Sequence, residues 1–326
     1  GFDMSITGID RITHGVEDLD ACRAFFADWG LKLVGESARG LDFETLNGCE
    51  VAVRRLDDPD LPPAMEPGPT LREVVWSAEA TDDLDRLRPV MSARPGFFEA
   101  DGTLFCLDPN GVRVGVRVSR KRPVTVTGLP ANTWDAAARV DTPAGFYERA
   151  EPIEVGHVVF FTLDLAAATA FYEALGFVVS DRYPGRGNFM RCAPRGGHHD
   201  LFLLEMPEGK RGLNHVAYTV RDIYEVFGGG LAMSRAGWKT QLGPGRHPIS
   251  SAFFWYFQNP AGALVEYYAD EDVLTEAWVP RDFTPGPTVF AEWAVAGGLD
   301  GHTRRQAAPP PAAPNPAQPK FLTDRG

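Results

Sequence analysis

Two histidines and one glutamate in the second half of the sequence have the types and surroundings of metal ligands. They are His157 in EVGHVVFF, His215 in GLNHVAYTV and Glu266 in ALVEYY, each within an apolar run typical of a buried strand. A carboxylate in such a run needs a partner to offset its lost hydration, and a metal ion would be one. Two imidazoles and a carboxylate on one side of a metal leave its other side open, as in non-haem iron(II) oxygenases. Three satisfied core residues are the alternative.

A diverged repeat predicts the elements that would position these residues. Residues 18–30 (DLDACRAFFADWG) match residues 164–176 (DLAAATAFYEALG). Each stretch begins at an aspartate and ends at a glycine, which favour the first and last turns of a helix. Apolar runs at 6–13 and 155–162 precede them as strands. Each half then continues with another strand, a helix pattern and a turn followed by a strand, DPNGV in the first half and NPAGA in the second.

These patterns divide the chain into two domains and a tail. We expect an N-terminal domain at 5–135, a linker within 130–143, a C-terminal domain at 151–285 that carries the metal site, and a tail at 286–326. The tail contains AAPPPAAPNPAQP, is rich in proline and alanine, and is expected to be largely disordered.

Paired units of strands and one helix resemble the vicinal oxygen chelate superfamily, which includes glyoxalases, bleomycin-resistance proteins and type I extradiol dioxygenases. The architecture and length most resemble the two-domain extradiol dioxygenases over residues 5–280, diffusely in the first half and specifically in the second. The resemblance implies an α+β fold of tandem βαβββ modules, two in each half, with the metal site in the C-terminal half. Inward-facing residues of its strands would converge on the metal.

The first half offers an internal comparison. Alignment of its helices and turns with those of the second half places three residues opposite the candidate ligands, in chain order Arg11, Trp76 and Gly115. None of these three can hold a divalent metal. We therefore expect the N-terminal domain to be a metal-free structural copy, which also argues against a glyoxalase I-like site.

A pair of histidines ahead of the second candidate ligand could supply acid–base chemistry. His198 and His199 follow two glycines and precede an apolar strand, and His199 lies 16 residues before His215. The pair resembles the segment of extradiol dioxygenases that carries their catalytic histidine, which His199 matches. Histidine suits proton transfer because its pKa lies near working pH. A solvated loop pair is the alternative.

The stretch from Gly245 onward holds the remaining candidates. Gly245-Arg246-His247 resembles a Gly-Arg-His turn of the same family, and Tyr256 follows nine residues later, as in the family pattern. The resemblance implies that Tyr256 hydrogen-bonds a substrate oxygen and that His247 helps to hold the substrate. The aromatic run FFWYF suits a planar aromatic substrate, and Phe189 could form part of the same apolar wall. A turn residue and aromatic core residues are the alternatives. The three residues after His247, PIS, depart from the acidic or amide residue expected to support it.

Composition and charge limit the kinds of partner that the protein could bind. The 326-residue chain has 44% hydrophobic and 23% charged residues and a formal net charge of −12. That charge disfavours nucleic acids and anionic membranes, and no apolar run reaches the roughly 18 residues of a membrane span. The four cysteines form no CxxC pair, and the first residues do not read as a signal peptide. We expect reduced thiols and a cytoplasmic location, and a homo-oligomer stays open.

Together these observations favour an iron(II)-dependent extradiol dioxygenase that opens a catecholic ring with O2 beside its two hydroxyls (meta-cleavage). Manganese(II) fits the same ligands. Two alternatives stay open. One is a keto-acid oxygenase like 4-hydroxyphenylpyruvate dioxygenase, which shares the fold and the triad. The other is a non-catalytic binding protein like the bleomycin-resistance proteins.

Overall fold

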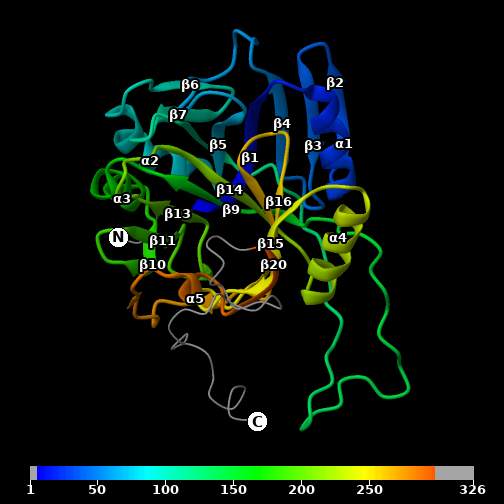
Figure 1. Ribbon diagram of the computed structural model, residues 1–326. Coiled ribbons are helices and arrows are strands. Elements are labelled where there is room, and N and C mark those ends of the chain that lie inside the picture. The colour runs from blue at the N-terminus through cyan, green and yellow to red at the C-terminus, as the bar shows by residue number, and fades with distance from the viewer. Residues whose placement is uncertain (1–5, 298–326) are drawn as a thin grey trace.

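The first half of the chain forms one mixed sheet. The structure is a computed structural model that describes residues 6–297, with the first half uppermost in Figure 1 (blue to cyan) and the second half below it. The eight strands lie in the order β2-β3-β4-β1-β5-β8-β7-β6. The elements of this half are β1 (Ile6–Val16), α1 (Leu19–Trp29), β2 (Lys32–Ser37), β3 (Gly40–Glu44), β4 (Glu50–Arg55), β5 (Thr70–Ala78), α2 (Thr81–Ser92), β6 (Phe98–Ala100), β7 (Thr103–Leu107) and β8 (Arg113–Val118).

The second half forms a larger sheet of ten strands, in the order β19-β10-β11-β13-β9-β14-β17-β16-β15-β20, with β12 and β18 paired separately. Its elements are β9 (Glu154–Phe161), α3 (Leu165–Ala174), β10 (Val178–Tyr183), β11 (Gly187–Arg191), β12 (Gly196–Gly197), β13 (Leu201–Leu204), β14 (Gly212–Thr219), α4 (Ile223–Arg235), β15 (Thr240–Arg246), β16 (Phe253–Gln258), β17 (Leu264–Ala269), β18 (Val273–Leu274), β19 (Arg281–Asp282), α5 (Pro287–Phe290) and β20 (Trp293–Gly297).

The central strands pair in the same way in both halves. In the first, β1 lies parallel to β4 and antiparallel to β5, which lies parallel to β8. In the second, β9 lies parallel to β13 and antiparallel to β14, which lies parallel to β17. The expected α+β fold of tandem βαβββ modules is confirmed.

The repeated helices begin and end where their sequences predict. Asp18 accepts the amide of Ala21 at 2.9 Å, and Asp164 accepts the amide of Ala167 at 3.0 Å, so each aspartate caps its helix. Gly30 follows α1 with a φ of 103°, a left-handed conformation that favours glycine at a helix end. These caps fix the turns that lead each helix back to its sheet.

The two halves pack against each other through buried aromatic side chains. The ring of Trp29 stacks on that of Tyr267 with centroids 3.5 Å apart, and the Tyr267 hydroxyl donates to the Trp29 carbonyl at 2.7 Å. On the other side, the Tyr172 hydroxyl donates to Asp108 Oδ2 at 2.7 Å. The first half therefore backs β17, the strand that also carries Glu266.

Residues 286–297 correct the expectation of a disordered tail from 286 onward. They form α5 and β20, and β20 pairs antiparallel with β15. The physical reason is that this segment is apolar enough to pack, because Ala291 and Ala294 are buried against Leu242, Phe254 and Tyr256. The second sheet thus extends past the predicted domain boundary at 285. The remainder of the predicted tail, 298–326, lies outside the described residues.

Removal of residues 307–326 is expected to leave the melting temperature nearly unchanged. This stretch, AAPPPAAPNPAQPKFLTDRG, has too few large apolar side chains to offset the entropy of ordering it. Differential scanning calorimetry of a chain ending at Gln306 checks this. A chain ending before β20 is the matched comparison and should melt lower, since it exposes the edge of β15. A melting temperature several degrees lower for the chain ending at Gln306 would contradict the prediction.

All four cysteines are buried and form no disulfide. Burial raises the pKa of the Cys22, Cys49 and Cys106 thiols to about 12, so these residues stay protonated and act as small core side chains. Within residues 6–297, no helix combines the length and the apolar character that crossing a membrane requires.

Candidate metal centre

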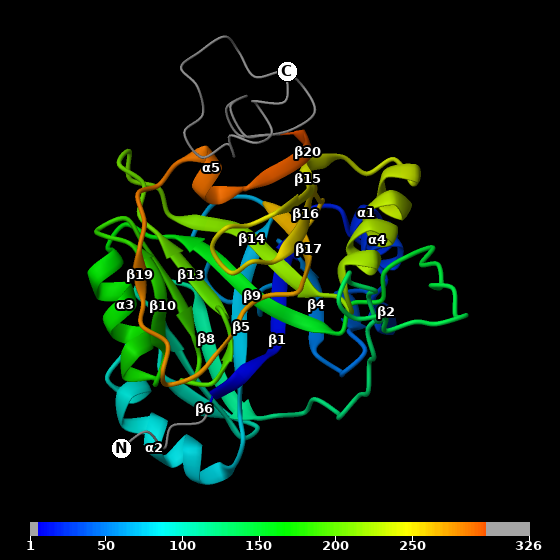
Figure 2. The ribbon, with the colours of Figure 1, turned by 90° about the horizontal axis from the view of Figure 1, so that it is seen from below.

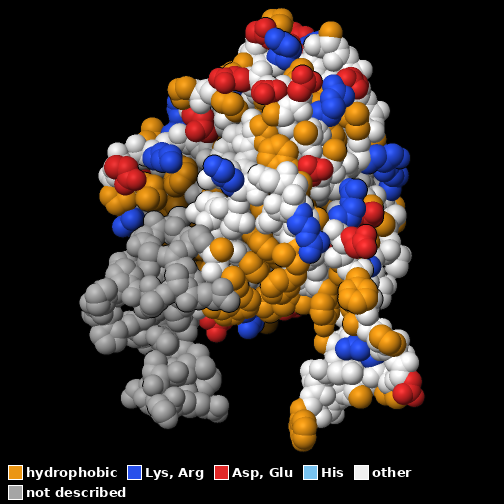
Figure 3. Space-filling view, turned by 45° about the vertical axis from the view of Figure 1, so that its right-hand side comes forward, with side chains coloured by type: hydrophobic (Ala, Val, Ile, Leu, Met, Phe, Trp, Pro, Cys, Tyr) orange, Lys and Arg blue, Asp and Glu red, His pale blue; other side chains and the backbone are white. Residues whose placement is uncertain are grey.

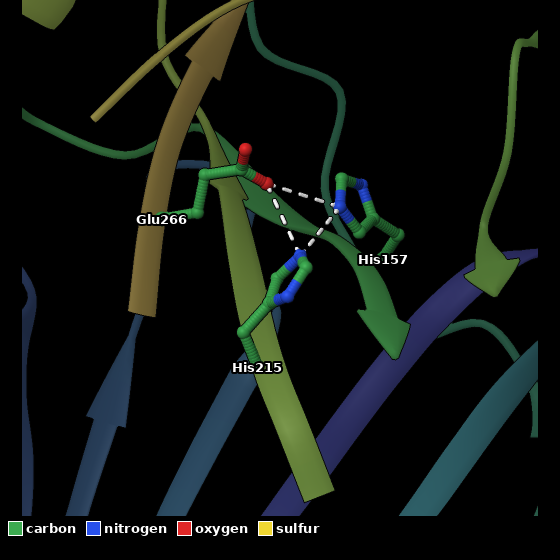
Figure 4. Close-up of side chains that lie close together, drawn as sticks. All are labelled: His157, His215 and Glu266. Carbon is green, nitrogen blue, oxygen red and sulfur yellow. Dashed lines mark hydrogen bonds and ion pairs between the residues drawn. The ribbon is translucent and has the colours of Figure 1, made fainter. Parts of the chain in front are cut away.

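Three neighbouring strands bring the candidate ligands together. His157 lies on β9, His215 on β14 and Glu266 on β17, and β14 is hydrogen-bonded to both of the others. Glu266 Oε1 lies 3.1 Å from His157 Nε2 and 3.4 Å from His215 Nε2, and the two nitrogens are 3.3 Å apart (Figure 4). All three residues are buried, and they are the metal-ligand cluster found among residues 6–297.

Their hydrogen bonds and protonation states suit a divalent cation. Burial lowers the pKa of His157 to about 4, so its imidazole is neutral. Burial alone would raise the pKa of Glu266, but the three surrounding imidazoles hold it well below its usual range. His215 Nδ1 lies 2.7 Å from Asn214 Oδ1, so it donates there and its Nε2 offers a lone pair to the cluster. Two imidazole nitrogens and a carboxylate oxygen, all within 4.8 Å of one another, are a ligand set that a metal ion could link.

No equivalent cluster lies among residues 6–118 of the first half. Ala217 pairs with both His157 and Glu266, and Val75 pairs in the same way with both Arg11 and Gly115. The strand register therefore agrees with two of the three predicted matches.

The third predicted match, of His215 with Trp76, is wrong. His215 lies two residues before Ala217, and the residue two before Val75 is Glu73, which is already ion-paired with Arg113. The misalignment arose at the following helix. Ala80 is the N-cap of α2, while Asp83 accepts the Ala80 amide at 2.9 Å from inside the first turn, so Asp83 does not correspond to the cap Asp222.

His199 lies beside the cluster at the end of a hydrogen-bonded chain. Its ring centroid is 4.2 Å from that of His157. Its Nδ1 lies 3.0 Å from His198 Nδ1, and His198 Nε2 lies 2.6 Å from Asp181 Oδ2. A neutral His198 that donates to the carboxylate accepts the Nδ1–H of His199 at its own Nδ1, and His199 Nε2 is then an acceptor. Burial holds the pKa of His199 well below its ordinary value, so the neutral base is the resting form.

His247 and Tyr256 lie on the Glu266 side of the cluster. His247 Nδ1 donates to the Phe290 carbonyl at 2.8 Å, and its Nε2 is 3.0 Å from Glu266 Oε2 and 3.2 Å from the Tyr256 hydroxyl. Tyr256 and Glu266 are direct partners across β16 and β17. The support for His247 that its sequence neighbours lack thus comes from a backbone carbonyl of α5.

One cavity of about 360 Å³ contains every predicted site residue, including Phe189. The side chains on one of its walls are apolar and pack together; they are Tyr183, Phe189, Phe202, Ile249 and Val289. Phe189 and Phe202 stack with centroids 3.8 Å apart. The cavity therefore places a planar apolar surface next to a cluster of polar, metal-binding groups.

Sequence reasoning missed several groups that hold the site. Asn214 directly precedes His215 and could have been noticed as its partner, whereas Asp181 and the Phe290 carbonyl carry no local signal. Glu271 was also missed. Its Oε2 is shielded from solvent, has no hydrogen-bond partner among the described residues, and belongs to the cavity lining. Gly197 makes room for this carboxyl group, because a Cβ there would lie 2.0 Å from Glu271 Oε1.

Glu271→Gln is expected to make the metal-free protein less sensitive to rising pH. Burial, together with the nearby charge of Asp200, raises the pKa of Glu271 well above its ordinary value of 4.5. A group whose pKa rises on folding contributes stability that is present below 4.5 and lost as pH rises through the folded pKa. The free energy of unfolding of the variant minus that of the parent should therefore be larger at pH 8 than at pH 5. Urea denaturation at the two pH values measures this difference.

The exposed Glu208→Gln is the control for this measurement, and its difference from the parent should not change with pH. If the free energy of unfolding of Glu271→Gln differed from that of the parent by the same amount at both pH values, the pKa of the Glu271 carboxyl group would not be raised by folding.

Comparison with known proteins places part of the second half of the chain in a family. Residues 154–267 match the Glyoxalase/Bleomycin resistance protein/Dioxygenase superfamily. Residues 154–267 are therefore a domain of that superfamily. All the predicted site residues lie within the superfamily match.

Individual relatives extend the likeness beyond the domain. Metapyrocatechase 2 of Cupriavidus necator is 33% identical over 208 residues, which are 61% of this chain and 62% of that protein. The chain therefore aligns with less than two thirds of the relative's length.

Two solved structures share the fold over most of the chain. A Mn(II)-bound glyoxalase from Novosphingobium aromaticivorans superposes with a TM-score of 0.70 at 25% identity and covers 94% of this chain and 96% of its own. The 2,2',3-trihydroxybiphenyl 1,2-dioxygenase from Sphingomonas wittichii gives 0.67 at 18% identity, covering 89% and 99%. At that identity the second comparison speaks for the fold alone.

Proposed function

We propose that this chain is an extradiol dioxygenase, which uses Fe(II) and O2 to open a catecholic ring beside its two hydroxyls. The observation that carries the proposal is the hydrogen-bonded chain from Asp181 through His198 to His199. This chain presents a neutral base to the cavity that also contains His157, His215 and Glu266. A metal-binding protein without catalysis has no need of such a base.

The three ligands fit Fe(II), which when bound would hold the catechol oxygens and dioxygen together and pass electrons between them. The side chains supply proton transfer and orientation. His199 Nε2 is the acceptor that takes a proton in the reaction and returns it later, while Asp181 and His198 keep its ring in the required tautomer. The neutral resting state of His199 prepares it to act first as a base.

Tyr256 and His247 orient the substrate from the opposite side. His247 Nε2 lies 3.0 Å from Glu266 Oε2 and 3.2 Å from the Tyr256 hydroxyl. A substrate oxygen near the triad would therefore come within reach of both His247 and Tyr256. The carbonyl of Phe290 holds His247 in place and couples the site to α5. The apolar wall around Phe189 and Phe202 suits an uncharged aromatic ring and excludes water.

Anaerobic reconstitution with Fe(II), followed by a panel of catechols in air, tests the proposal. Formation of a yellow ring-opened product with stoichiometric O2 uptake supports it. Mn(II) is the second metal to test, because it fits the same ligands and a relative of similar fold is a Mn(II)-bound protein. Turnover of 4-hydroxyphenylpyruvate with no turnover of any catechol would favour the keto-acid oxygenase. Purified protein that takes up no metal would favour a binding module.

A further inference from the structure

The connection between the two halves is much longer than the distance it spans. Lys121 Nζ, just after β8, lies 3.9 Å from Glu154 Oε2 at the start of β9, so the chain returns close to where it left. Between these points, residues 130–145 project away from the body, as the green loop in Figures 1 and 2 shows. We call these residues the arm.

The arm is anchored firmly at its base. Asp222 Oδ2 accepts the amide of Leu129 at 2.9 Å and the hydroxyl of Tyr147 at 3.3 Å, so one carboxylate holds both ends of the arm. Its other oxygen, Oδ1, caps α4 by accepting the amide of Glu225 at 3.0 Å. The direction of the arm is therefore tied to a helix of the second half.

The arm also holds its own shape. Arg139 donates from its side chain to the carbonyls of Pro130 at 3.0 Å and Thr142 at 3.1 Å. The side chain of Asn132 binds both the amide and the carbonyl of Arg139, at 2.6 and 3.1 Å. Fixing a residue's backbone costs about 1–2 kcal/mol, and an ordered loop of this length needs buried surface to offset that cost.

Within one copy of the chain the arm buries almost none of its apolar surface. Trp134 is fully exposed, Val140 is 70% exposed, and Phe146 at the base is 95% exposed. The projection at the lower right of Figure 3 shows hydrophobic atoms at its end. An exposed tryptophan on an ordered projection is typical of a contact with another molecule.

The same chain offers a cavity of about 360 Å³ that can receive an indole ring. It lies at the base of the arm, where Leu46, Phe146 and Tyr147 supply apolar and aromatic surface. Arg221 covers the Tyr147 ring at 3.8 Å. The rest of the lining is mostly polar or charged, and the carboxylates of Glu148, Glu151 and Glu225 can accept an indole N–H.

Charge opposes contact between the bodies of two copies, and it opposes contact through the arm less. The body of an acidic protein repels its own copies, since the chain carries a net charge of −12. The arm carries only Asp135, Arg139 and Asp141, a net charge of −1, and makes contact at a distance from the body. Because the projection and the cavity belong to one segment, two copies can exchange them about a two-fold axis and leave no unpaired surface.

We propose that residues 130–145 are a dimerisation arm, which docks Trp134 of one copy into the cavity at the base of the arm of a second copy. Sedimentation velocity of the metal-loaded full chain over a wide concentration range tests this. The parent should be a dimer, and Trp134→Ser should weaken the dimer by at least about 30-fold, the size expected for a central tryptophan. Val279→Ser, at a 77% exposed valine outside the arm, should leave the dimer unchanged.

Two further measurements locate the contact. A chain with Gly-Ser-Gly-Ser in place of residues 130–145 keeps the Leu129 and Tyr147 anchors, so it should fold, bind metal and be monomeric. An Asp135→Cys copy, which keeps Trp134, mixed with a Leu46→Cys copy should form an intermolecular disulfide. A parent that is monomeric throughout would overturn the proposal, as would a dimer that survives loss of the arm. A dimer that needs Trp134 but gives no disulfide would overturn the assigned cavity.

Discussion

Glu266→Ala is expected to remove most of the metal affinity of the protein. Glu266 is the only anionic ligand of the triad, and without it the Nε2 atoms of His157 and His215 face each other at 3.3 Å with no charge to favour a cation. Loss of an outer-shell partner alone weakens metal binding about 10- to 100-fold, so loss of this ligand should exceed 100-fold. Competition with a chelating dye measures the affinity, and elemental analysis of the reconstituted protein measures the stoichiometry.

The first half supplies the matched control. Glu73 occupies the place equivalent to His215 but is ion-paired with Arg113, so Glu73→Ala should keep one metal per chain. Glu266→Ala protein that retained stoichiometric metal would show that the triad is wrong. Loss of metal from Glu73→Ala would show that the first half takes part in binding.

The ligands could be predicted because burial makes polar residues conspicuous. His157, His215 and Glu266 each stand alone in an apolar strand, and a buried polar group needs a partner. The family resemblance then implied that the strands carrying them would converge, although the three residues are far apart in the chain. Helix caps such as Asp18 and Asp164 worked as guides because an aspartate side chain satisfies a backbone amide by a purely local contact.

The same local logic failed where a residue had more than one use. An aspartate near a helix start can act from inside the first turn, as Asp83 does, and this moved the match of His215 by three residues. Residues after 285 were assigned to the tail because of the proline and alanine that follow, although α5 and β20 contain their own apolar side chains. Neither error arises from the core, where alternation and capping agree.

The support of the site could not be predicted, because it comes from contacts across long stretches of sequence. The Asp181 carboxylate is hydrogen-bonded to both Arg281 and His198, and Arg281 lies 100 residues away in the sequence. His247 is held by the carbonyl of Phe290, and any residue type offers a carbonyl. A sequence pattern can indicate which side chains do chemistry, but the groups that orient them depend on the register of strands that meet only in the fold.

His199→Ala and His199→Gln are expected to keep the metal and bind a catechol while losing most turnover. His199 is not among the three ligands, but its Nε2 is the free acceptor beside them. A general acid–base residue contributes about 10²- to 10⁴-fold to rate, so kcat should fall by that factor. Metal analysis, anaerobic catechol titration and O2 uptake separate the three properties. Loss of metal would make His199 a ligand, and full activity would remove the main reason for preferring a ring-cleaving enzyme.

His198 decides whether the hydrogen-bonded chain matters. Alternation along a strand predicts that His198 points away from the site and has little effect, but residues 198 and 199 lie outside the strands and their rings are hydrogen-bonded. His198→Ala removes the acceptor of the His199 Nδ1–H, and kcat should fall about 10- to 100-fold, as for other outer-shell partners. His198→Gln retains an acceptor oxygen and should recover part of that loss at unchanged metal content. Equal losses in both variants would point to a disturbed loop, because the glutamine oxygen can still accept the hydrogen bond that alanine cannot.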